Sequence, residues 1–161
     1  MAHPITLRPY QPGDGPLLAA LFYETVHTVN ARDYTPAQLQ AWAPSPEAPD
    51  PEAWDRSFQG RRALVAEAGG QIAGFGDLDP ETGCLDRLYV HKDRQGQGVA
   101  STLCAALEAA ARTDRVHTYA SLTARPFFLR RGYRLLRENQ VERRGVLLTN
   151  FLMEKNLPDS P

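Results

Sequence analysis

The sequence predicts a mixed α/β fold of the α+β class, with a central, mostly antiparallel twisted sheet of about six to seven strands and helices on both of its faces. Three observations predict it. Residues 62 to 90 read as successive strands separated by tight turns. Residues 84 to 122 read as a strand, a glycine-bearing turn, a helix and another strand, which is a βαβ crossover. The end of the chain, from about residue 133 to residue 154, reads as a long hairpin.

The length and composition are those of one domain. The chain has 161 residues, of which 42% are hydrophobic, and this is enough to supply a core. We therefore expect a single domain over residues 1–161, made of the first strand with its following helices (5–60), the central sheet (61–123) and a short helix with the C-terminal hairpin (124–155). The formal charge of −1 argues against a dedicated nucleic-acid surface, because such domains usually carry a basic excess.

The chain shows no sign of export or of a membrane span. No apolar run approaches the roughly 20 residues needed to cross a bilayer. The N-terminal residues lack a charged segment followed by an apolar one, so they do not read as a signal peptide. Cys84 and Cys104 lack metal-ligand spacing. We therefore expect a cytoplasmic protein with no membrane partner, no metal and two reduced, buried cysteines.

A first strand and a first helix are predicted near the N-terminus. Residues 5–10 alternate between apolar and polar side chains, and Pro9 indicates an edge or an end of this strand. Asp14 is expected to cap the following helix, and Pro16 suits its first turn. Apolar residues then recur on one face up to about Asn30.

Two shorter helices follow, each opened by a capping residue and a proline. Thr35 with Pro36 begins the first, and Pro44 ends it. Asp50 with Pro51 begins the second. The proline-rich stretch between the two helices reads as a stiff linker within the domain, because too little chain precedes it to form a core of its own.

Antiparallel strands joined by short turns come next, at residues 62–68, 71–78 and 84–90. Gly69 and Gly70 form a strong two-residue hairpin turn between the first two. Gly74 and Gly76 lie inside the second strand. They mark a bulge, a place where another segment packs closely, or loose edge residues, and the sequence leaves all three open.

The turn between the strand at 84–90 and the next helix has the features of an anion-binding site. Small residues at positions 96, 98 and 100 allow a ligand to approach the backbone, and the first N–H groups of a helix carry the positive end of its dipole. A P-loop would need a lysine after Gly98, and a dinucleotide-binding turn would need a glycine where Ser101 stands. A phosphate chain bound in another way is therefore the expected ligand.

Two motifs carry a family resemblance. The pattern Gln95-x-x-Gly98-x-Ala100 resembles the signature Q/R-x-x-G-x-G/A of the GNAT superfamily of acetyl-CoA-dependent N-acetyltransferases. The later pattern Ser121-x-x-Ala124-x-x-Phe127-Phe128-x-x-x-Gly132-Tyr133 resembles the family's N-x-x-A-x-x-F-Y-x-x-x-G-F. The motif-bearing resemblance extends from about residue 63 to residue 155. Within the superfamily, the segments 33–44, 124–133 and 150–155 look most like the YafP-like bacterial acetyltransferases.

The resemblance implies that acetyl-CoA binds as a co-substrate in a gap where the strands around Val90 and Val116 splay apart. The glycine turn would hold the pyrophosphate, with Lys92, Arg94 or Arg125 available to the remaining phosphate charge. The residues expected to bind acetyl-CoA are Leu88, Tyr89, Val90, Gln95, Gly96, Gln97, Gly98, Val99, Ala100, Ser101 and Phe127.

The implied activity is that of an acyltransferase which passes the acetyl group directly to a primary amine of a small molecule, a peptide or a protein. Asp86 is the expected general base, unless it only forms a surface ion pair with Arg87. Phe128 stands where the family often has a tyrosine that protonates the leaving thiolate. Tyr133 and Ser121 are the expected substitutes, with water or an unassisted departure as alternatives.

The sequence leaves alternatives open for the acceptor pocket and for the functional class. Tyr23, His27, Tyr34 and Trp42 lie where the family builds its acceptor pocket, although these rings could simply pack against the sheet. Because of Phe128, a non-catalytic acyl-CoA-binding or regulatory module of the same fold stays open beside the enzyme. A nucleotide-binding domain of another fold is a third alternative. The edge of the C-terminal hairpin also offers a surface for a homodimer.

Overall fold

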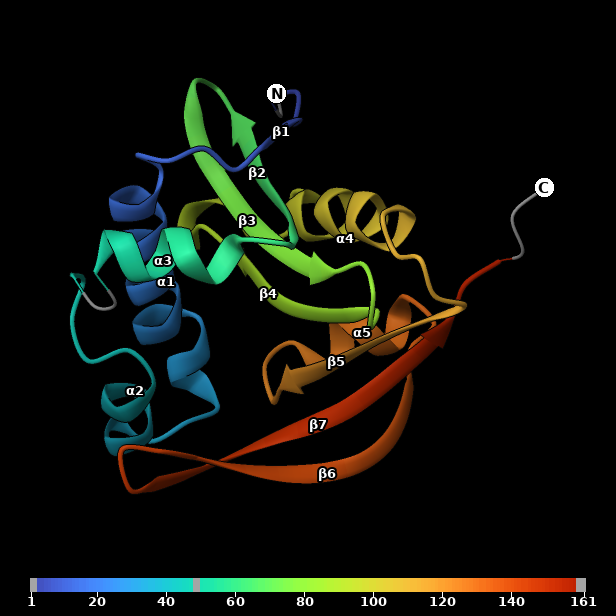
Figure 1. The fold of residues 1–161 in the computed structure, drawn as a ribbon. Coiled ribbons are helices and arrows are strands. Elements are labelled where there is room, and N and C mark those ends of the chain that lie inside the picture. The colour runs from blue at the N-terminus through green and yellow to red at the C-terminus, as the bar shows by residue number, and fades with distance from the viewer. Residues whose placement is uncertain (1–2, 48–49, 159–161) are drawn as a thin grey trace.

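The computed structural model describes residues 3–47 and 50–158, and its centre is a seven-stranded sheet with the order β1-β2-β3-β4-β5-β7-β6 (Figure 1). The strands are β1 (Thr6–Pro9), β2 (Arg62–Ala68), β3 (Gln71–Asp79), β4 (Cys84–Val90), β5 (Arg115–Ser121), β6 (Arg134–Arg143) and β7 (Val146–Asn156). Neighbouring strands are antiparallel except β4 and β5, which are parallel. This confirms the predicted mixed sheet, with β1 at one edge.

Helices cover both faces of the sheet (Figure 1). They are α1 (Gly15–Thr28), α2 (Pro36–Trp42), α3 (Pro51–Phe58), α4 (Val99–Ala109) and α5 (Arg125–Arg130), with the short 3₁₀ helices η1 (Asn30–Arg32) and η2 (Lys92–Arg94). Alternate residues of β2 pack into a cluster with α4 and α5 on one face and into a cluster with α1 and α3 on the other. Within the described residues, no helix is long and apolar enough to cross a membrane.

Local signals explain where α2 and α3 begin. The Thr35 hydroxyl accepts a hydrogen bond from the N–H of Gln38, whose side chain accepts one from the N–H of Thr35. The Asp50 carboxylate accepts one from the N–H of Ala53. Both caps are as predicted from the sequence.

The predicted cap at Asp14 is wrong. Asp14 precedes α1, but its side chain makes no capping hydrogen bond. Instead its two carboxylate oxygens accept hydrogen bonds from the Arg8 guanidinium at 2.8 and 2.9 Å, and one also accepts from the N–H of Gln11. The hydrogen bonds from Arg8 lower the pKa of Asp14. A charged partner on β1 has outcompeted the helix end for this carboxylate.

Gly74 and Gly76 in β3 are places of close packing, one of the three interpretations that the sequence left open. A Cβ on Gly76 would lie 2.7 Å from the carbonyl oxygen of Arg87 and 3.0 Å from Cδ1 of Leu107. A Cβ on Gly74 would lie 2.7 Å from the carbonyl oxygen of Tyr89. Because these two residues have no side chain, α4 can pack closely against β3 while β3 pairs with β4.

The strand β4 contains one extra residue, and its pairing with β5 ends there. In the β3–β4 register Arg87 pairs with Asp77 and Leu85 with Leu78, so Asp86 is the unpaired residue of a β-bulge. In the described chain β4 pairs with β5 at two positions, Cys84 and Leu85. Beyond Leu85 the two strands diverge (Figure 1), as the family resemblance implies.

We expect Gly76→Ala to lower the free energy of unfolding by about 1–3 kcal/mol, because the new methyl group would press α4 and β4 away from β3. Urea unfolding followed by circular dichroism measures the change. Leu147→Ala, at a side chain that is 59% exposed, is the control and should change stability by less than about 0.5 kcal/mol. Equal stability of Gly76→Ala and the wild type would contradict the close packing of α4 on β3.

Candidate active site

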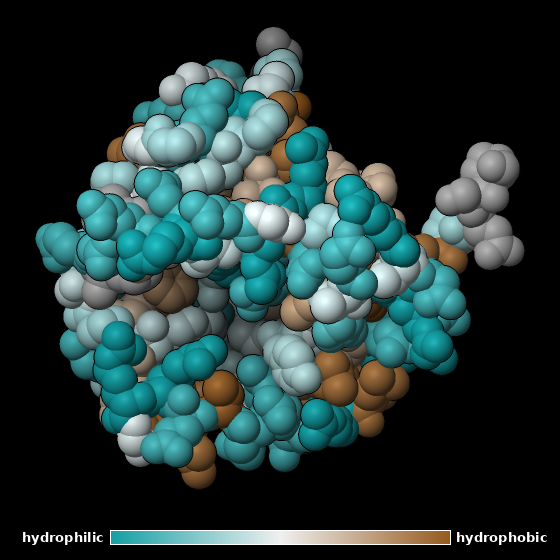
Figure 2. All heavy atoms as spheres, in the orientation of Figure 1, coloured by the Kyte–Doolittle hydropathy of each residue, from teal (hydrophilic) through white to brown (hydrophobic). Residues whose placement is uncertain are grey.

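Two cavities meet where β4 and β5 diverge. The gap cavity, of about 610 Å³, lies between these strands, the start of α4 and α5. The hairpin cavity, of about 960 Å³, lies between α1, α2, α3 and the β6–β7 hairpin. Figure 2 shows the hollow near the centre of this face, with a mostly hydrophilic rim. The residues that line both cavities are Trp42, Leu85, Asp86, Tyr89, Tyr119 and Ser121.

The glycine turn forms one wall of the gap cavity. Gly96 and Gly98 have φ angles of 72° and 87°, which favour glycine. Among the described residues, no atom would lie within 4 Å of a Cβ on either. The helix α4 starts at Val99 with no side-chain cap, so its first N–H groups have no partner within the helix or from such a cap. The turn thus combines open space with backbone donors at the positive end of a helix.

Almost all residues predicted to bind acetyl-CoA come together around the gap cavity. Those that line it are Leu88, Tyr89, Val90, Gln95, Gly96, Gly98, Val99, Ala100, Ser101 and Phe127. Gln97 does not line it; its side-chain amide donates to the carbonyl of Asp93 at 3.4 Å. The structure therefore does not support a contact from the Gln97 side chain.

The backbone of β4 presents donors to this gap. The N–H of His91 bonds to β3, whereas the carbonyl of Val90 accepts hydrogen bonds from Thr25 and Gln95, each at 2.9 Å. Because successive residues of a strand point to opposite neighbours, the N–H groups of Leu88 and Val90 face the side that β5 has left. The Val90 carbonyl already accepts two hydrogen bonds. By the same alternation the Leu88 carbonyl also faces this side, so β4 presents two N–H donors and one further carbonyl to the gap.

Of the three basic residues expected to meet phosphate charge, only one lines the gap cavity. Arg94 lines the cavity as expected, and its guanidinium also donates to the carbonyl of Ala68 at 3.3 Å. Lys92 and Arg125 do not line it, and the Arg125 guanidinium lies over the ring of Phe151. Two arginines that the sequence did not single out do line it, and these are Arg32 and Arg130.

Asp86 lies at the junction of the two cavities, with its side chain 54% exposed. The alternative interpretation of an ion pair with its neighbour Arg87 does not hold. Arg87 instead makes a bidentate pair with the fully buried Asp77, at 2.7 and 2.9 Å. The basic group near Asp86 is Arg61, whose Nη1 lies 3.9 Å from Oδ2 of Asp86.

Tyr133 is too far inside the protein for the role expected of it. Its hydroxyl donates to Glu108 at 2.7 Å in a buried cluster that includes Cys104 and Arg131, and Tyr133 lines neither cavity. Burial, together with the neighbouring Cys104 and Glu108, raises the pKa of Tyr133 strongly. A hydroxyl that is bonded to a carboxylate there cannot protonate a leaving thiolate in the gap, which corrects the prediction.

Ser121 and Phe128 both line the gap cavity, and Ser121 also lies at its junction with the hairpin cavity. The Ser121 hydroxyl lines both cavities and accepts a hydrogen bond from the N–H of Ala124 at 3.0 Å. Phe128 is 3% exposed and lines the gap cavity. Tyr119, two residues before Ser121 and on the same face of β5, also lines both cavities. The strand periodicity at Ser121 was the signal that could have identified Tyr119.

The four residues expected at the acceptor pocket fall into two pairs. Tyr34 and Trp42 line the hairpin cavity. Tyr23 and His27 line neither cavity: their rings stack with centroids 4.3 Å apart, and Nε2 of His27 lies 2.7 Å from the carbonyl oxygen of Ala43. For Tyr23 and His27 the structure favours the simpler interpretation of packing.

Tyr34 also joins distant parts of the chain. Its hydroxyl donates to the carbonyl of Thr149 at 2.7 Å and accepts a hydrogen bond from the N–H of Leu122 at 2.9 Å. The segment between α1 and α2 is thereby held to the end of β5 and to β7. The same hydroxyl therefore fixes one wall of the hairpin cavity.

Comparisons with known proteins agree with this architecture. A family model for an acetyltransferase (GNAT) domain matches residues 30–157. YafP, an uncharacterized N-acetyltransferase of Escherichia coli strain K12, is 34% identical over 149 residues, which cover 92% of this chain and 94% of YafP. The crystal structure of a GCN5-related N-acetyltransferase from Rhodopseudomonas palustris matches with a TM-score of 0.89 and 35% identity over 98% of both chains.

A more distant structure shares the fold alone. PaiA N-acetyltransferase from Thermoplasma acidophilum, solved in complex with coenzyme A, matches with a TM-score of 0.72 and 18% identity. The match covers 96% of this chain and 99% of that one.

The buried cluster predicts an acid-dependent loss of stability. Burial raises the pKa of Glu108, but hydrogen bonds from Arg131 and Tyr133 and the charge of Lys155 outweigh it, so the net pKa is lowered from its usual 4.5. A lowered folded-state pKa stabilises the protein above the unfolded-state value, and this contribution is lost as the pH falls through the folded-state pKa. We therefore expect the stability difference between wild type and Glu108→Gln to shrink from pH 7 to about pH 3.

Urea unfolding at a series of pH values measures that difference. Glu52→Gln is the control, because the Glu52 side chain is 89% exposed and its pair with Arg56 should contribute little at any pH. A difference for Glu108→Gln that stays constant over this range would show that the Glu108 carboxylate is not stabilised by its partners.

Proposed function

Because the chain belongs to the GNAT acetyltransferase family, we propose that it is an N-acetyltransferase, a single domain that passes the acetyl group of acetyl-CoA directly to a primary amine. The observation that carries the proposal is the meeting of two cavities at the β4–β5 gap beside Asp86. One cavity would hold the coenzyme and the other the amine. The acetyl group would then be transferred from the coenzyme to the amine at the junction of the two cavities.

The gap cavity suits the phosphates and the pantetheine arm of acetyl-CoA. The open backbone at Gly96 and Gly98 leads into the N-terminus of α4, which favours a pyrophosphate. Arg32, Arg94 and Arg130 line the same cavity and could pair with further phosphate charge. The PaiA enzyme, which has the same fold, was solved in complex with coenzyme A, and this supports the choice of ligand.

The reaction needs few groups, because the thioester is already activated. The neutral amine nitrogen attacks the acetyl carbon, a C–N bond forms, the C–S bond breaks, and the coenzyme leaves as a thiolate. We assign stabilisation of the developing oxyanion to a backbone N–H of Leu88 or Val90, since these donors face the gap. No covalent intermediate on the protein is required.

Asp86 is the proposed general base. An aliphatic amine with a pKa near 10.4 costs about 4–5 kcal/mol to deprotonate at pH 7, so a carboxylate that collects the proton, directly or through water, lowers the barrier. Asp86 lies at the cavity junction and is half exposed, so water reaches it.

Ser121 and Tyr119 are the proposed donors to the leaving thiolate in place of the missing hydroxyl at Phe128. Both line the junction, whereas Tyr133 is bonded inside the Glu108 cluster. Phe128 still favours the second candidate function, a non-catalytic module that binds an acyl-coenzyme A. That module would bind acetyl-CoA but release no thiol with any amine.

We expect Gly98→Glu to weaken acetyl-CoA binding at least about 100-fold, because the side chain places bulk and negative charge where the pyrophosphate would bind. Isothermal titration calorimetry measures the dissociation constant. Gly70→Glu is the matched control: it has a similar φ of 78°, no atom within 4 Å of a Cβ, and it lies in the β2–β3 turn outside both cavities. Equal losses in the two variants, or no binding to folded wild type, would rule out this coenzyme site.

We expect Asp86→Asn to reduce kcat about 100-fold or more at pH 7 while the dissociation constant of acetyl-CoA stays within about twofold, because the amide cannot accept the amine's proton. Thiol release with an accepted amine measures kcat. Asp79→Asn, in β3 and outside both cavities, is the control and should keep full activity. Full activity in Asp86→Asn would assign the proton transfer to another group.

A further inference from the structure

The hairpin cavity carries more positive than negative charge. Four arginines line it, and these are Arg61, Arg87, Arg143 and Arg144. The only carboxylate among its described lining residues is that of Asp86. The buried Asp77 offsets the charge of Arg87. The remaining arginines face a single aspartate, so this wall disfavours a polycationic acceptor and favours one that carries an anion.

Two hydrogen-bond donors in this wall lack an acceptor. Among the described residues, the buried side-chain nitrogens with no hydrogen-bond partner are Nε1 of Trp54 and Nη1 of Arg61. Trp54 is 3% exposed, and both residues line the hairpin cavity. Nη1 of Arg61 lies 3.7 Å from Asp77 and 3.9 Å from Asp86, beyond hydrogen-bond distance in both cases. An unpaired buried donor is costly, so this wall holds more hydrogen-bond donors than its own acceptors satisfy. The Arg61 side chain is 29% exposed, so other parts of it are open to a ligand.

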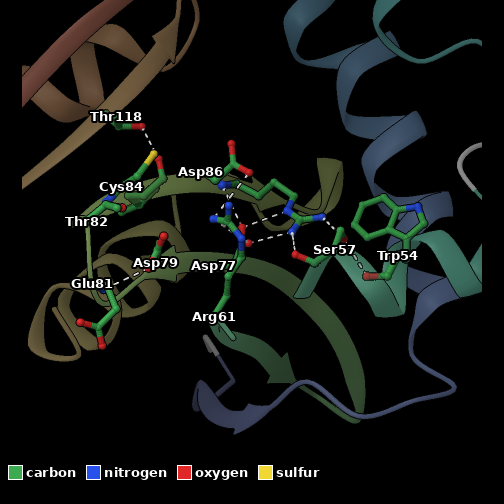
Figure 3. Close-up of polar contacts among 12 residues, drawn as sticks. Trp54, Ser57, Arg61, Asp77, Asp79, Glu81, Thr82, Cys84, Asp86 and Thr118 are labelled. Atoms are coloured by element: carbon green, nitrogen blue, oxygen red, sulfur yellow. Dashed lines mark hydrogen bonds and ion pairs between the residues drawn. The ribbon is translucent and has the colours of Figure 1, made fainter. Parts of the chain in front are cut away.

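The positions of Arg61 and Asp86 also define a spacing. Nη1 of Arg61 lies 3.9 Å from Oδ2 of Asp86, and Figure 3 shows the two side chains close together. Asp86 also lines the gap cavity. A ligand that meets both must present a cationic or protonatable nitrogen and an anion close together. An α-amino carboxylate does this, because its amine and its carboxylate are separated by one carbon atom. The amine then lies by the proposed base and the carboxylate by the arginine.

Six aromatic residues also line the hairpin cavity. The rings that line it belong to Phe22, Tyr34, Trp42, Trp54, Tyr89 and Tyr119. Such a wall favours a large apolar or aromatic side chain, because ring-to-ring contacts add to the burial of apolar surface.

We propose that the acceptor is a free α-amino acid with an aromatic or other large apolar side chain, whose carboxylate is bound by Arg61. This inference rests on the proposed acetyltransferase function and specifies its substrate class. The aromatic wall receives the side chain, Arg61 pairs with the carboxylate, and the α-amine is directed to Asp86 and the gap. Arg61 is thus a specificity-determining residue, not a participant in proton transfer.

The test compares L-phenylalanine, L-tyrosine and L-tryptophan with their carboxamides as acceptors, with acetyl-CoA and thiol detection. The amide of each pair has the less basic amine, so protonation alone would make the amides better acceptors. We expect the amino acids to have at least about tenfold higher kcat/KM in the wild type. Amides that react equally well or better, or transfer to other amines with none to this panel, would overturn the proposal and leave the acetyltransferase function standing.

Variants of Arg61 test whether this residue causes the preference for amino acids over their amides. Arg61→Gln should lower the ratio of amino acid to amide to one or below, as amine protonation alone favours, by lowering kcat/KM for the amino acids. Arg61→Lys, which keeps the charge, should restore part of the ratio. Arg112→Gln, at a side chain that is 73% exposed and paired with Glu81 outside both cavities, is the control. A ratio unchanged in Arg61→Gln would also overturn the proposal.

A binding measurement separates this proposal from the enzymatic one. If no amine is acetylated although acetyl-CoA binds, the proposed function fails, and calorimetric titration with L-phenylalanine and its amide still decides the acceptor site. Tighter binding of the amino acid, weakened at least tenfold by Arg61→Gln, would support the site in a non-catalytic protein. Equal binding of the two ligands, or none, would reject it.

Discussion

The extra residue that Asp86 inserts into β4 is the constraint on which the site depends. A bulge bends its strand and increases the local twist, and here it falls directly after Leu85, the last residue that pairs with β5. The hydroxyl of Thr118 donates to the Leu85 carbonyl at 2.8 Å and secures the two strands at that point. Beyond this point the strands separate, and the two cavities meet at the gap between them. The bulge therefore creates the opening and places a carboxylate in it.

The buried Asp77 explains how the bulge is held. The carboxylate accepts hydrogen bonds from both the backbone N–H and the guanidinium of Arg87, the residue after the bulge. The same guanidinium donates to Ser57 and lies over the ring of Phe58 with a distance of 3.9 Å to its centroid, so α3 is tied to β4. A buried ion pair is costly to desolvate and is retained only when its hydrogen bonds are well satisfied, as they are here. One cluster thus fixes the bulge, α3 and the wall that carries Arg61.

Features that depend on neighbouring residues were predictable from the sequence, and partners on other structural elements were not. The caps at Thr35 and Asp50 and the glycine turn at Gly98 depend on residues within one turn of the chain, so their patterns were sufficient. Asp14 and Tyr133 have partners that the sequence pattern did not reveal. Arg8 competes for Asp14 from the preceding strand, and Glu108 binds Tyr133 across 25 positions in sequence. Only the folded topology brings these groups together.

The two halves of the site also differ in what defines them. The glycine turn and the first N–H groups of α4 form one wall of the gap cavity. The sequence signature of this wall is therefore a spacing of small residues, and the residue types around them can vary. Side chains from α1 to β7 form the hairpin cavity, and no local motif contains them. If the hairpin cavity binds the acceptor as proposed, substitutions at Arg61 or on the β6–β7 hairpin would change the acceptor without disturbing the glycine turn. This separation explains why the proposed coenzyme site has a recognisable motif, whereas the proposed acceptor site had to be inferred from the folded structure.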